Sequence, residues 1–417
     1  MTGEYGSVAS QNNSRRAGVV RRAADARRRA VDAPWDADPL GADGVFGAGD
    51  VGRAGGRGRD GDRAGDGRGA EEPLGVARGD PPPGARRRAV LGGHRDAVRR
   101  CGVTTRAVAS AAATVANLGP GFDVIGACLE GPRDSVTAEL TGDGLVTLVA
   151  VTGDGGKLAP SGGNVVEVVA RHVLDRFAAP GTGVKLWLDK GLPLGSGMGS
   201  SSASSVAAAL AVAALIDSEI PKAALLDACR EGERLAAGTP HADNVAPCLF
   251  GGIVACLPGD GEVVHILPLP VPDGLLVVAV KPEYDVKTSD ARAALPKTVS
   301  MDDAVHTAAA TAAFVMGLAN GDYALMARGC DERLATPSRK GFVRGYEGVV
   351  AAARRVGAVG AGLSGSGPTI YALSDDRETA IEIAEAMVDA FSEAGATAKA
   401  VISGVDPHGA QVSLLDV

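Results

Sequence analysis

A run of glycine and serine residues in the middle of the chain has the composition of an anion-binding loop. Residues 193–204 have the sequence PLGSGMGSSSAS, with Gly195, Gly197 and Gly199 directly before a long apolar stretch. Glycine lets the backbone bend and approach a ligand closely. The N-terminus of a following helix offers unpaired N–H groups and the positive end of its dipole. The segment therefore predicts a polyphosphate site, although a serine-capped turn is the simpler alternative and the GxxxxGK[ST] pattern of a Walker A loop is absent.

A tight turn places two polar side chains close together. Asn117 and Asp123 flank a Gly-Pro-Gly turn in the sequence ANLGPGFD. An amide both donates and accepts hydrogen bonds, and a carboxylate pairs with an ammonium group. The same sequence is also that of an ordinary Asx-type β-turn, so by itself the motif leaves both interpretations open.

His241, Asp243 and Asn244 form a polar cluster in a predicted loop ahead of a Gly-Gly pair, in the sequence HADNVAP. No second His or Cys lies at zinc-ligand spacing, so a metal site of that kind is not expected.

A further glycine loop, residues 362–369 (GLSGSGPT), lies between two predicted strands and opens no helix. We expect this loop to close over the first one from a second domain.

Strands and helices alternate along the chain after residue 103, which predicts a two-domain α+β protein with a boundary near Pro270. Predicted strands are 103–113, 135–140, 144–151, 184–188, 253–257, 263–267, 275–280, 360–363, 369–373 and a last one at 398–402. Predicted helices are 164–177, 200–215, 222–236, 302–319, 323–334, 345–356 and 377–394.

The charge of the chain is unevenly distributed. The formal net charge is −8, but residues 1–103 contain 19 Arg and no Lys against 14 Asp or Glu, so the rest is more acidic than the total. An acidic body argues against a nucleic-acid partner, which needs a basic face. No apolar run is long enough to span a bilayer. Six cysteines without a CxxC pair predict free thiols in a reducing compartment.

Residues 1–103 differ in kind from the rest, because Arg, Gly, Asp and Pro dominate and apolar periodicity is lacking. Such a segment buries too little apolar surface to offset the entropy of ordering, so we expect disorder. Three explanations stay open: a targeting peptide, a flexible regulatory tail, or translation from a start codon placed too far upstream. The absence of Lys and the Arg/Gly/Ala/Asp/Pro bias favour the third.

Together and in this order, these motifs resemble those of the GHMP kinase superfamily, which includes galactokinase, homoserine kinase and mevalonate kinase. Its members carry a substrate-side turn, a PxxxGLGSS phosphate loop and a GxGxGP-like loop in the C-terminal domain. The resemblance covers about residues 104–410. It implies a two-domain α+β GHMP kinase fold, with a ribosomal protein S5 domain 2-like N-terminal domain (104–270) that binds ATP and a ferredoxin-like C-terminal domain (271–417).

Within the superfamily, the motifs resemble most closely those of the homoserine kinase subfamily. That subfamily carries a [ST]ANLGPGFD-like turn, an HxDNVAP segment, a VxTxxARxxLP segment and a GISGSGPT loop. The matching stretches here are residues 115–123, 241–247, 286–296 and 362–369. The chain departs from the pattern where Val115 replaces Ser or Thr, Met198 replaces Leu, and Thr336 replaces the Glu of an EPxR segment, of which Arg339 remains.

The resemblance implies a role for each site residue. The hydroxyl-bearing amino acid would lie with its ammonium toward Asp123 and its carboxylate toward the guanidinium groups of Arg292 and Arg339. Ser200 and Glu233 would bind Mg²⁺. The implied substrate-binding residues are Asn117, Asp123, His241, Asp243, Arg292 and Arg339. The implied ATP-binding residues are Pro193, Leu194, Gly195, Ser196, Gly197, Met198, Gly199, Ser200, Ser201, Ser202 and Ala203.

One position bears on the catalytic mechanism. Mevalonate-type relatives have a catalytic Asp seven residues before the Gly-Gly pair, and here that position is Asn244. Because an amide does not take up a proton, our hypothesis is catalysis without a strong side-chain base. Positioning and charge stabilisation by Asn244 and Arg292 would replace it, as phosphoryl transfer permits.

Two other interpretations remain. The chain could be another GHMP kinase that acts on mevalonate, shikimate or a sugar, or a non-catalytic member that senses a ligand. A Rossmann dehydrogenase is disfavoured, because Gly195–Gly199 does not continue as GxGxxG. We expect a small-molecule substrate, no nucleic-acid or membrane partner, a homodimer as in many family members, and a cytoplasmic location, with organelle targeting by residues 1–103 as the lesser alternative.

Overall fold

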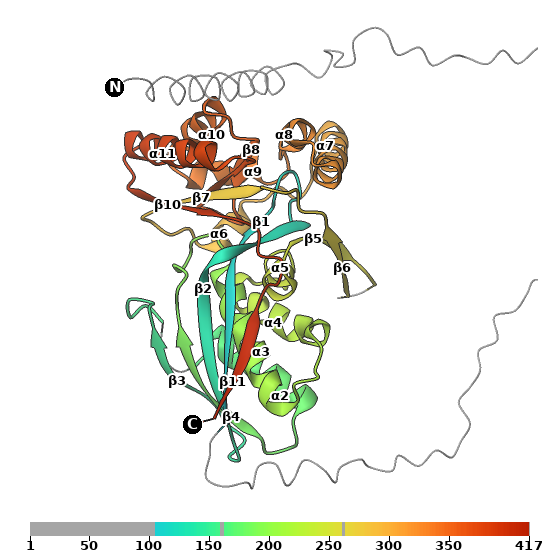
Figure 1. Ribbon diagram of the computed structural model, residues 1–417, viewed down its shortest axis with the longest axis vertical. Helices are drawn as coiled ribbons and strands as arrows, with labels where there is room; N and C mark the ends of the chain where they lie inside the picture. The colour runs from blue at the N-terminus through green and yellow to red at the C-terminus, as the bar shows by residue number, and fades with distance from the viewer. Residues whose placement is uncertain (1–104, 159–161, 261–262, 417) are drawn as a thin grey trace, which may run out of the picture. The chain divides into compact units, whose positions relative to one another are not determined.

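The computed structural model describes residues 105–158, 162–260 and 263–416, which form two β-sheets with helices packed against them (Figure 1). The strands are β1 (Thr105–Ala116), β2 (Ile125–Thr141), β3 (Val146–Thr152), β4 (Gly183–Asp189), β5 (Ile253–Pro258), β6 (Val264–Leu269), β7 (Leu276–Pro282), β8 (Gly360–Leu363), β9 (Ile370–Ser374), β10 (Ala398–Ser403) and β11 (Gln411–Asp416). The α-helices are α2 (Val165–Phe177), α3 (Ser200–Ile216), α4 (Leu226–Ala237), α5 (Val245–Phe250), α6 (Thr288–Ala293), α7 (Met301–Asn320), α8 (Tyr323–Gly329), α9 (Thr336–Arg339), α10 (Tyr346–Arg355) and α11 (Arg377–Glu393). Short 3-10 helices are η1 (Lys222–Leu225) and η2 (Lys340–Phe342).

The first sheet has seven strands and is mostly antiparallel. Its main order is β11-β1-β2-β4-β3, and the start of β2 also pairs with β5, which pairs with β6. Only β3 and β4 among these described strands run parallel. The pairing of β1 with β2 shifts register between Ala112 and Thr114, which turns the end of β1 out of regular alternation. This irregular end of β1 leads directly into the turn with Asn117 and Asp123.

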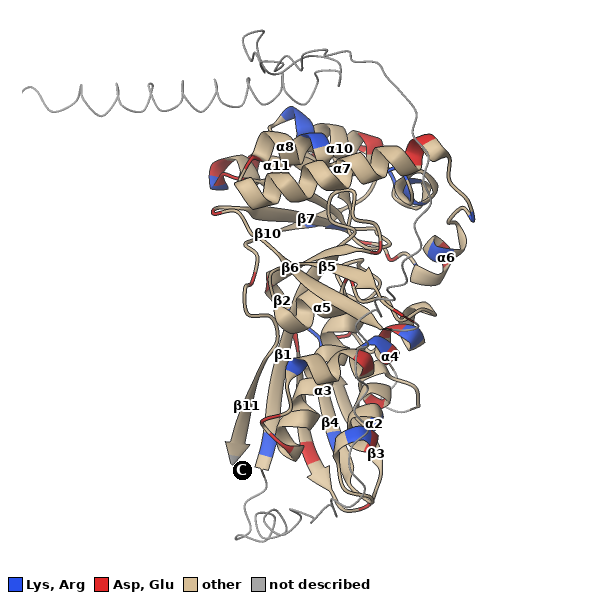
Figure 2. Ribbon diagram, turned by 90° about the vertical axis from the view of Figure 1, so that its right-hand side faces the viewer, with Lys and Arg blue, Asp and Glu red and all other residues tan. Residues whose placement is uncertain are grey.

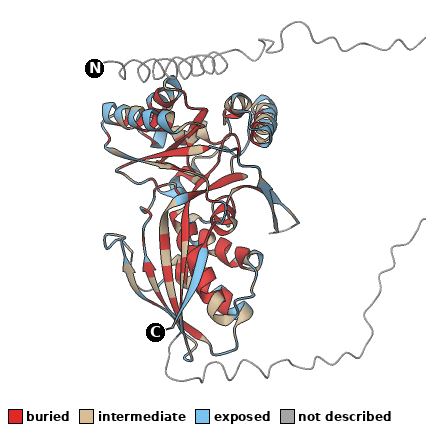
Figure 3. Cartoon of the chain, in the orientation of Figure 1, coloured by how far each residue is buried: buried red, intermediate tan, exposed pale blue. Residues whose placement is uncertain are grey.

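Helix α3 packs on the first sheet and is buried along most of its length (Figure 3). Its sequence is almost entirely Ala, Ser, Val and Leu, and small side chains let a helix lie close to the strands β1 and β2. Neighbouring helices α2 and α4 cover the same side (Figure 1). Asn164 caps α2 in a capping box with Glu167, which fixes where that helix begins. The phosphate loop thus leads into a helix that is buried along most of its length.

The second sheet is antiparallel, with the strand order β10-β7-β9-β8. Helices α10 and α11 pack against each other and against its strands. A separate apolar cluster fills this interface, with Val278, Ile370, Met387 and Phe391 fully buried. This second core supports the glycine loop between β8 and β9.

The predicted α+β class is confirmed, but three local predictions were wrong. β10 is not the last strand, because β11 follows it and returns to pair with β1 in the first sheet. Residues 245–250 form helix α5 instead of a loop, since Pro247 lies in the first turn, where a missing N–H is tolerated. The helix predicted over 323–334 ends at Gly329. The disorder expected for residues 1–103 concerns a segment outside the described residues. None of the described helices has the length and hydropathy to cross a bilayer.

Candidate active site

The phosphate loop adopts the backbone that its glycines allow. Gly195, Gly197 and Gly199 all have positive φ angles, of 58°, 78° and 67°. A Cβ atom at Gly197 would lie 2.5 Å from the carbonyl oxygen of Ser364, so the loop also needs glycine for close approach. Helix α3 begins at Ser200 without any side-chain cap. Its first N–H groups are therefore left for an anion.

A cavity of about 520 Å³ lies over this loop and helix N-terminus. Its wall includes Gly195, Ser196, Gly197, Gly199 and Ser200 from the loop and Glu233 from α4. Asn244 lines the same cavity, as does Ser366 of the second glycine loop. The cavity thus collects residues of the phosphate loop, the two predicted metal-binding residues and Asn244 from separate parts of the chain, whereas Arg292, the other predicted catalytic residue, does not line it.

A buried ion pair that the sequence analysis missed lies behind the phosphate loop. Lys190 contacts the carboxylate of Asp134, and both side chains are almost completely inaccessible. The Lys190 ammonium also donates to Ser200 Oγ (2.7 Å) and Ser204 Oγ (2.9 Å). Burial lowers the pKa of Lys190, and Asp134 opposes that shift. A lysine directly after an apolar strand and three residues before the loop was the available indication.

Glu233 and Ser200 offer oxygen atoms to the same cavity. Glu233 is buried on α4, where burial raises its pKa and hydrogen bonds from Ser201 and Ser202 lower it. Ser202 Oγ donates to Glu233 Oε1 at 2.9 Å. Magnesium takes oxygen ligands, commonly one or two from the protein and the rest from phosphate and water. The two side chains therefore fit a nucleotide-bound magnesium ion.

The turn between β1 and β2 holds Asn117 and Asp123 in strained backbone conformations. Both have positive φ angles, 60° and 56°, which are uncommon for residues other than glycine. Asn117 stabilises the turn, because its Oδ1 accepts the backbone N–H of Asp123 (2.9 Å). Its Nδ2 donates to the carbonyl of Gly365 (2.8 Å), which ties the turn to the second glycine loop.

Charged groups from separate elements meet beside this turn. Arg292 of α6 forms an ion pair with Asp123 (2.8 Å) and contacts His241. Burial lowers the pKa of His241, with an opposing effect of Asp123 and a reinforcing one of Arg292. Arg339 is buried and donates to the carbonyls of Ala291 (3.2 Å) and Gly365 (3.2 Å). Figure 2 shows basic and acidic residues gathered on α4 and α6.

The sequence analysis also missed Phe122. The guanidinium carbons of Arg292 and Arg339 lie 5.7 Å and 5.0 Å from the centre of its ring. A ring face attracts cations, so Phe122 holds two like charges near each other. Arg292 and Arg339 thus bring two positive charges beside the carboxylate of Asp123, an arrangement that suits the carboxylate of a substrate.

Asp243 and Asn244 lie between the phosphate loop and the charged residues beside the β1–β2 turn. Asp243 is buried, and burial raises its pKa to about 7, with further increases from Asp123 and Glu233. The close approach of β2 fixes its position, because a Cβ atom at Gly126 would lie 1.8 Å from its carbonyl oxygen. Asn244 Oδ1 accepts a hydrogen bond from Thr114 Oγ1 (2.7 Å).

The second glycine loop packs directly on the first, as predicted. Ser364 Oγ donates to the carbonyl of Gly197 (2.7 Å). The backbone N–H of Thr369 donates to the carbonyl of Ser196 (3.2 Å). The N–H of Gly365 donates to the carbonyl of Ala116 (3.0 Å). This loop therefore connects the phosphate loop to the turn that carries Asn117.

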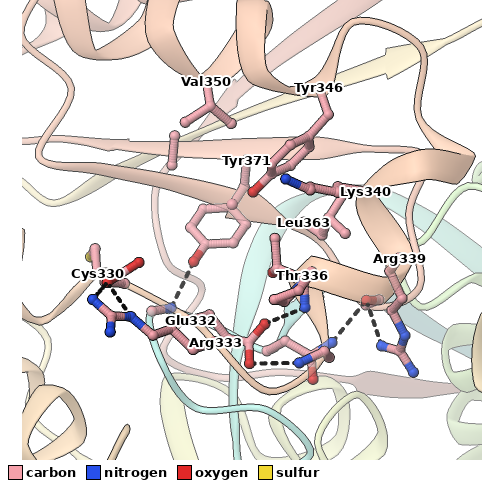
Figure 4. Close-up of a pocket in the computed structure, with 18 of the residues that line it drawn as sticks. Cys330, Glu332, Arg333, Thr336, Arg339, Lys340, Tyr346, Val350, Leu363 and Tyr371 are labelled. Atoms are coloured by element: carbon pink, nitrogen blue, oxygen red, sulfur yellow. Dashed lines mark hydrogen bonds and ion pairs between the residues drawn. The ribbon is translucent and has the colours of Figure 1, made fainter. Parts of the chain in front are cut away.

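A second cavity, of about 290 Å³, is lined by Asn117, Gly365 and Arg339 together with residues around the second sheet (Figure 4). In it the Tyr371 hydroxyl accepts the backbone N–H of Gly119 (2.7 Å). The Glu332 carboxylate accepts backbone N–H groups at the start of α9, the helix that carries Arg339. The side chains of this cavity thus support the acceptor-side turn and arginine from behind.

Comparison with known proteins identifies related sequences. The family model for the GHMP kinases N terminal domain matches residues 164–252, and that for the GHMP kinases C terminal matches residues 314–393. A protein of Natronomonas pharaonis named homoserine kinase is 40% identical over 291 residues, which cover 70% of this chain and 94% of that protein. Another of that name, from Chlorobium phaeobacteroides, is 36% identical, with 68% and 91% covered.

Solved structures resemble the chain in the same way. The crystal structure of homoserine kinase from Cytophaga hutchinsonii is 36% identical and superposes with a TM-score of 0.70, covering 74% of this chain and 97% of that one. A mevalonate kinase of L. major, in complex with R-mevalonate, has a TM-score of 0.56 at 17% identity, with 73% and 96% covered. The second likeness shows a shared fold alone.

Proposed function

The chain belongs to the GHMP kinase family, and we propose that it transfers the γ-phosphoryl group of ATP to the hydroxyl of L-homoserine, forming O-phospho-L-homoserine for threonine biosynthesis. The observation that carries this proposal is the 36–40% identity to proteins named homoserine kinase over at least nine-tenths of their length. His241, Asp243 and Asn244 belong to the HxDNVAP segment on which the resemblance to homoserine kinases rests. All three lie at the candidate site, which supports the same substrate.

The nucleotide would bind in the cavity of about 520 Å³, with its phosphates over residues 193–203. Backbone N–H groups at the start of α3 and the helix dipole stabilise the negative charge. Ser200 and Glu233 would hold Mg²⁺, and that ion neutralises charge on the phosphate oxygens when bound. Lys190 and Asp134 keep Ser200 in place from behind the loop.

The amino acid would bind on the acceptor side of the site. Arg292 and Arg339 would take its carboxylate, and Asp123 would take its ammonium group, with Asn117, His241 and Asp243 around it. Binding of the carboxylate would exchange part of the Arg292–Asp123 ion pair for contacts with the substrate. This arrangement favours homoserine over mevalonate, which has a carboxylate but no ammonium group.

Catalysis would depend on positioning and on stabilising the charge of the transferring group. Asn244 lines the nucleotide cavity next to the phosphate loop, and Arg292 lies toward the acceptor. Neither side chain is a proton acceptor at neutral pH. The loose transition state of phosphoryl transfer makes little demand on a base, which is consistent with an amide at position 244.

The test is an assay of ADP release by the full chain with ATP, Mg²⁺ and one acceptor at a time. The acceptors are L-homoserine, mevalonate, shikimate and galactose. We expect turnover with homoserine and at most trace turnover with the others. Turnover with another acceptor instead would refute the substrate assignment, and a folded protein inactive with all four would favour a ligand-sensing role.

We also propose a cytoplasmic enzyme that acts as a homodimer, without nucleic-acid or membrane partners. Five described cysteines (Cys128, Cys229, Cys248, Cys256 and Cys330) are buried free thiols, which supports a reducing compartment. Light scattering of the purified chain tests the dimer.

The proposed domains are residues 104–270 and 271–417. Strand β11 belongs to the second domain by sequence but pairs with β1 in the first sheet.

A further inference from the structure

Thr114 connects β1 to both the phosphate loop and Asn244. Its side chain is completely buried in a stretch of strand that otherwise carries only Ala and Val. Its hydroxyl donates to Asn244 Oδ1 at 2.7 Å, and its backbone N–H donates to the carbonyl of Met198 at 3.1 Å. Burying a hydroxyl is costly unless it is hydrogen-bonded, so this contact also explains why a polar residue is tolerated there.

The phosphate loop is shaped around this hydrogen bond. A Cβ atom at Gly199 would lie 2.1 Å from Thr114 Oγ1 and 2.9 Å from Asn244 Oδ1. The last loop residue before α3 therefore packs directly against the Thr114–Asn244 pair. The register shift between Ala112 and Thr114 in the pairing of β1 with β2 is the backbone irregularity that places Thr114 here.

We propose that Thr114 is a positioning residue that fixes which way the amide of Asn244 faces. This inference rests on the kinase function and on the role proposed for Asn244. With Oδ1 held by Thr114, the two N–H donors of Nδ2 lie at the opposite edge of the planar amide group. Asn244 lines the nucleotide cavity, and in this proposal its Nδ2 donors are the groups that face the phosphate oxygens of bound ATP.

The opposite amide orientation would hinder catalysis. If Oδ1 faced the cavity, its lone pairs would lie against phosphate oxygens that carry negative charge during transfer. A donor aimed at developing charge stabilises the transition state, whereas an acceptor destabilises it. Thr114 thus makes Asn244 a hydrogen-bond donor to the transferring group without touching the substrate itself.

The first experiment compares Thr114→Val, which removes the hydroxyl and keeps the shape, with Thr114→Ser, which keeps the hydroxyl. Kinetics are measured with ATP and L-homoserine. We expect Thr114→Val to lower kcat about 10- to 100-fold, the size of a positioning defect, with the KM for ATP within about twofold. Thr114→Ser should retain most of kcat. Thr137→Val, on the adjacent strand β2, is the matched control for a threonine-to-valine exchange and should leave kcat unchanged.

A double-mutant cycle separates this role from a general structural one. If Thr114 acts through Asn244, Thr114→Val should add little to the loss already caused by Asn244→Ala. Additive losses, or a loss of ATP affinity equal to the loss of kcat, would overturn the inference. Activity of the wild type with homoserine in the same assay keeps this result distinct from the test of the function itself.

Asn244→Asp tests the amide orientation even where a Thr114 variant does not fold. A carboxylate keeps the bond from Thr114 but places an oxygen where the N–H donors were. We expect kcat to fall at least about 100-fold in the pH range where the new carboxyl group is ionised. An unchanged or higher rate that rises with pH would show that position 244 accepts a proton, which contradicts the donor role.

Discussion

The nucleotide side and the acceptor side of the site are built in different ways. The nucleotide side uses backbone N–H groups and glycines from one short segment, residues 193–203, supported by a buried ion pair behind it. On the acceptor side, charged side chains come from the β1–β2 turn, the loop before α5, α6 and α9. The first side is formed before any ligand arrives, whereas on the second the charges pair with one another.

The two sides of the site therefore contribute differently to the stability of the protein and to its choice of substrate. Polyphosphate is common to all kinases, so the backbone of a rigid loop suffices to bind it. An amino acid is recognised by charges at two ends, and charged side chains must be placed at a set distance for that purpose. We therefore expect changes on the nucleotide side to affect folding and kcat, and changes on the acceptor side to affect the KM for the amino acid.

The largest effect is expected for Lys190→Met. Removing one partner of a buried ion pair leaves Asp134 uncompensated, which typically costs about 3–5 kcal/mol of unfolding free energy. Urea denaturation measures this loss. Lys185→Met, an exposed position on β4, is the control, and combining Lys190→Met with Asp134→Asn should restore part of the stability. A single variant as stable as the wild type would show that the phosphate loop needs no buried support.

Glu233→Gln should lower kcat about 100-fold with little change in stability, because the amide keeps the shape and still accepts from Ser202. The concentration of Mg²⁺ at half-maximal rate should rise in a titration at saturating ATP. Glu231→Gln, on the same helix and paired with Arg234, should resemble the wild type. An unchanged Mg²⁺ dependence of Glu233→Gln would remove this residue from the metal site.

Arg339→Gln should raise the KM for homoserine about 10- to 100-fold, the value of a charge-assisted hydrogen bond, and leave the KM for ATP unchanged. Arg339→Lys should restore only part of the affinity for homoserine, because an ammonium group lacks the two parallel N–H donors of a planar guanidinium group. Steady-state kinetics with each substrate varied measure both constants. Arg355→Gln, at an exposed position at the end of α10, is the control. An equal rise in both KM values would erase the division between the two sides.

The smallest effect concerns the pH dependence of stability. Asp243 has a pKa of about 7 in the folded protein, above its ordinary 3.8, so the folded state holds a proton that the unfolded chain releases. Its contribution to stability is therefore full below about pH 4 and is lost as pH rises through about 7. The unfolding free energy of the wild type should fall between pH 5 and pH 7, and Asp243→Asn should make this fall smaller by about 1–2 kcal/mol. Identical slopes for both proteins would indicate that Asp243 is ionised in the folded state.

Local features were predictable from the sequence. The α+β class, the loop of residues 193–204, the helix that follows it and the second glycine loop were all expected and are present. Glycine and helix-initiating residues act over a few positions, so their pattern determines the backbone near them. The same holds for the motif residues that associate the chain with its family.

Long-range contacts required the tertiary structure. Thr114 and Asn244 are 130 positions apart, and Asn117 and Gly365 are 248 apart. No periodicity links such residues, because packing of the sheets and loops alone brings them together. For the same reason the sequence did not reveal Lys190 behind the loop, Phe122 under two arginines, or the return of β11 to the first sheet. The sequence by itself determined the family and its local motifs, and the tertiary structure decided which side chains support and orient them.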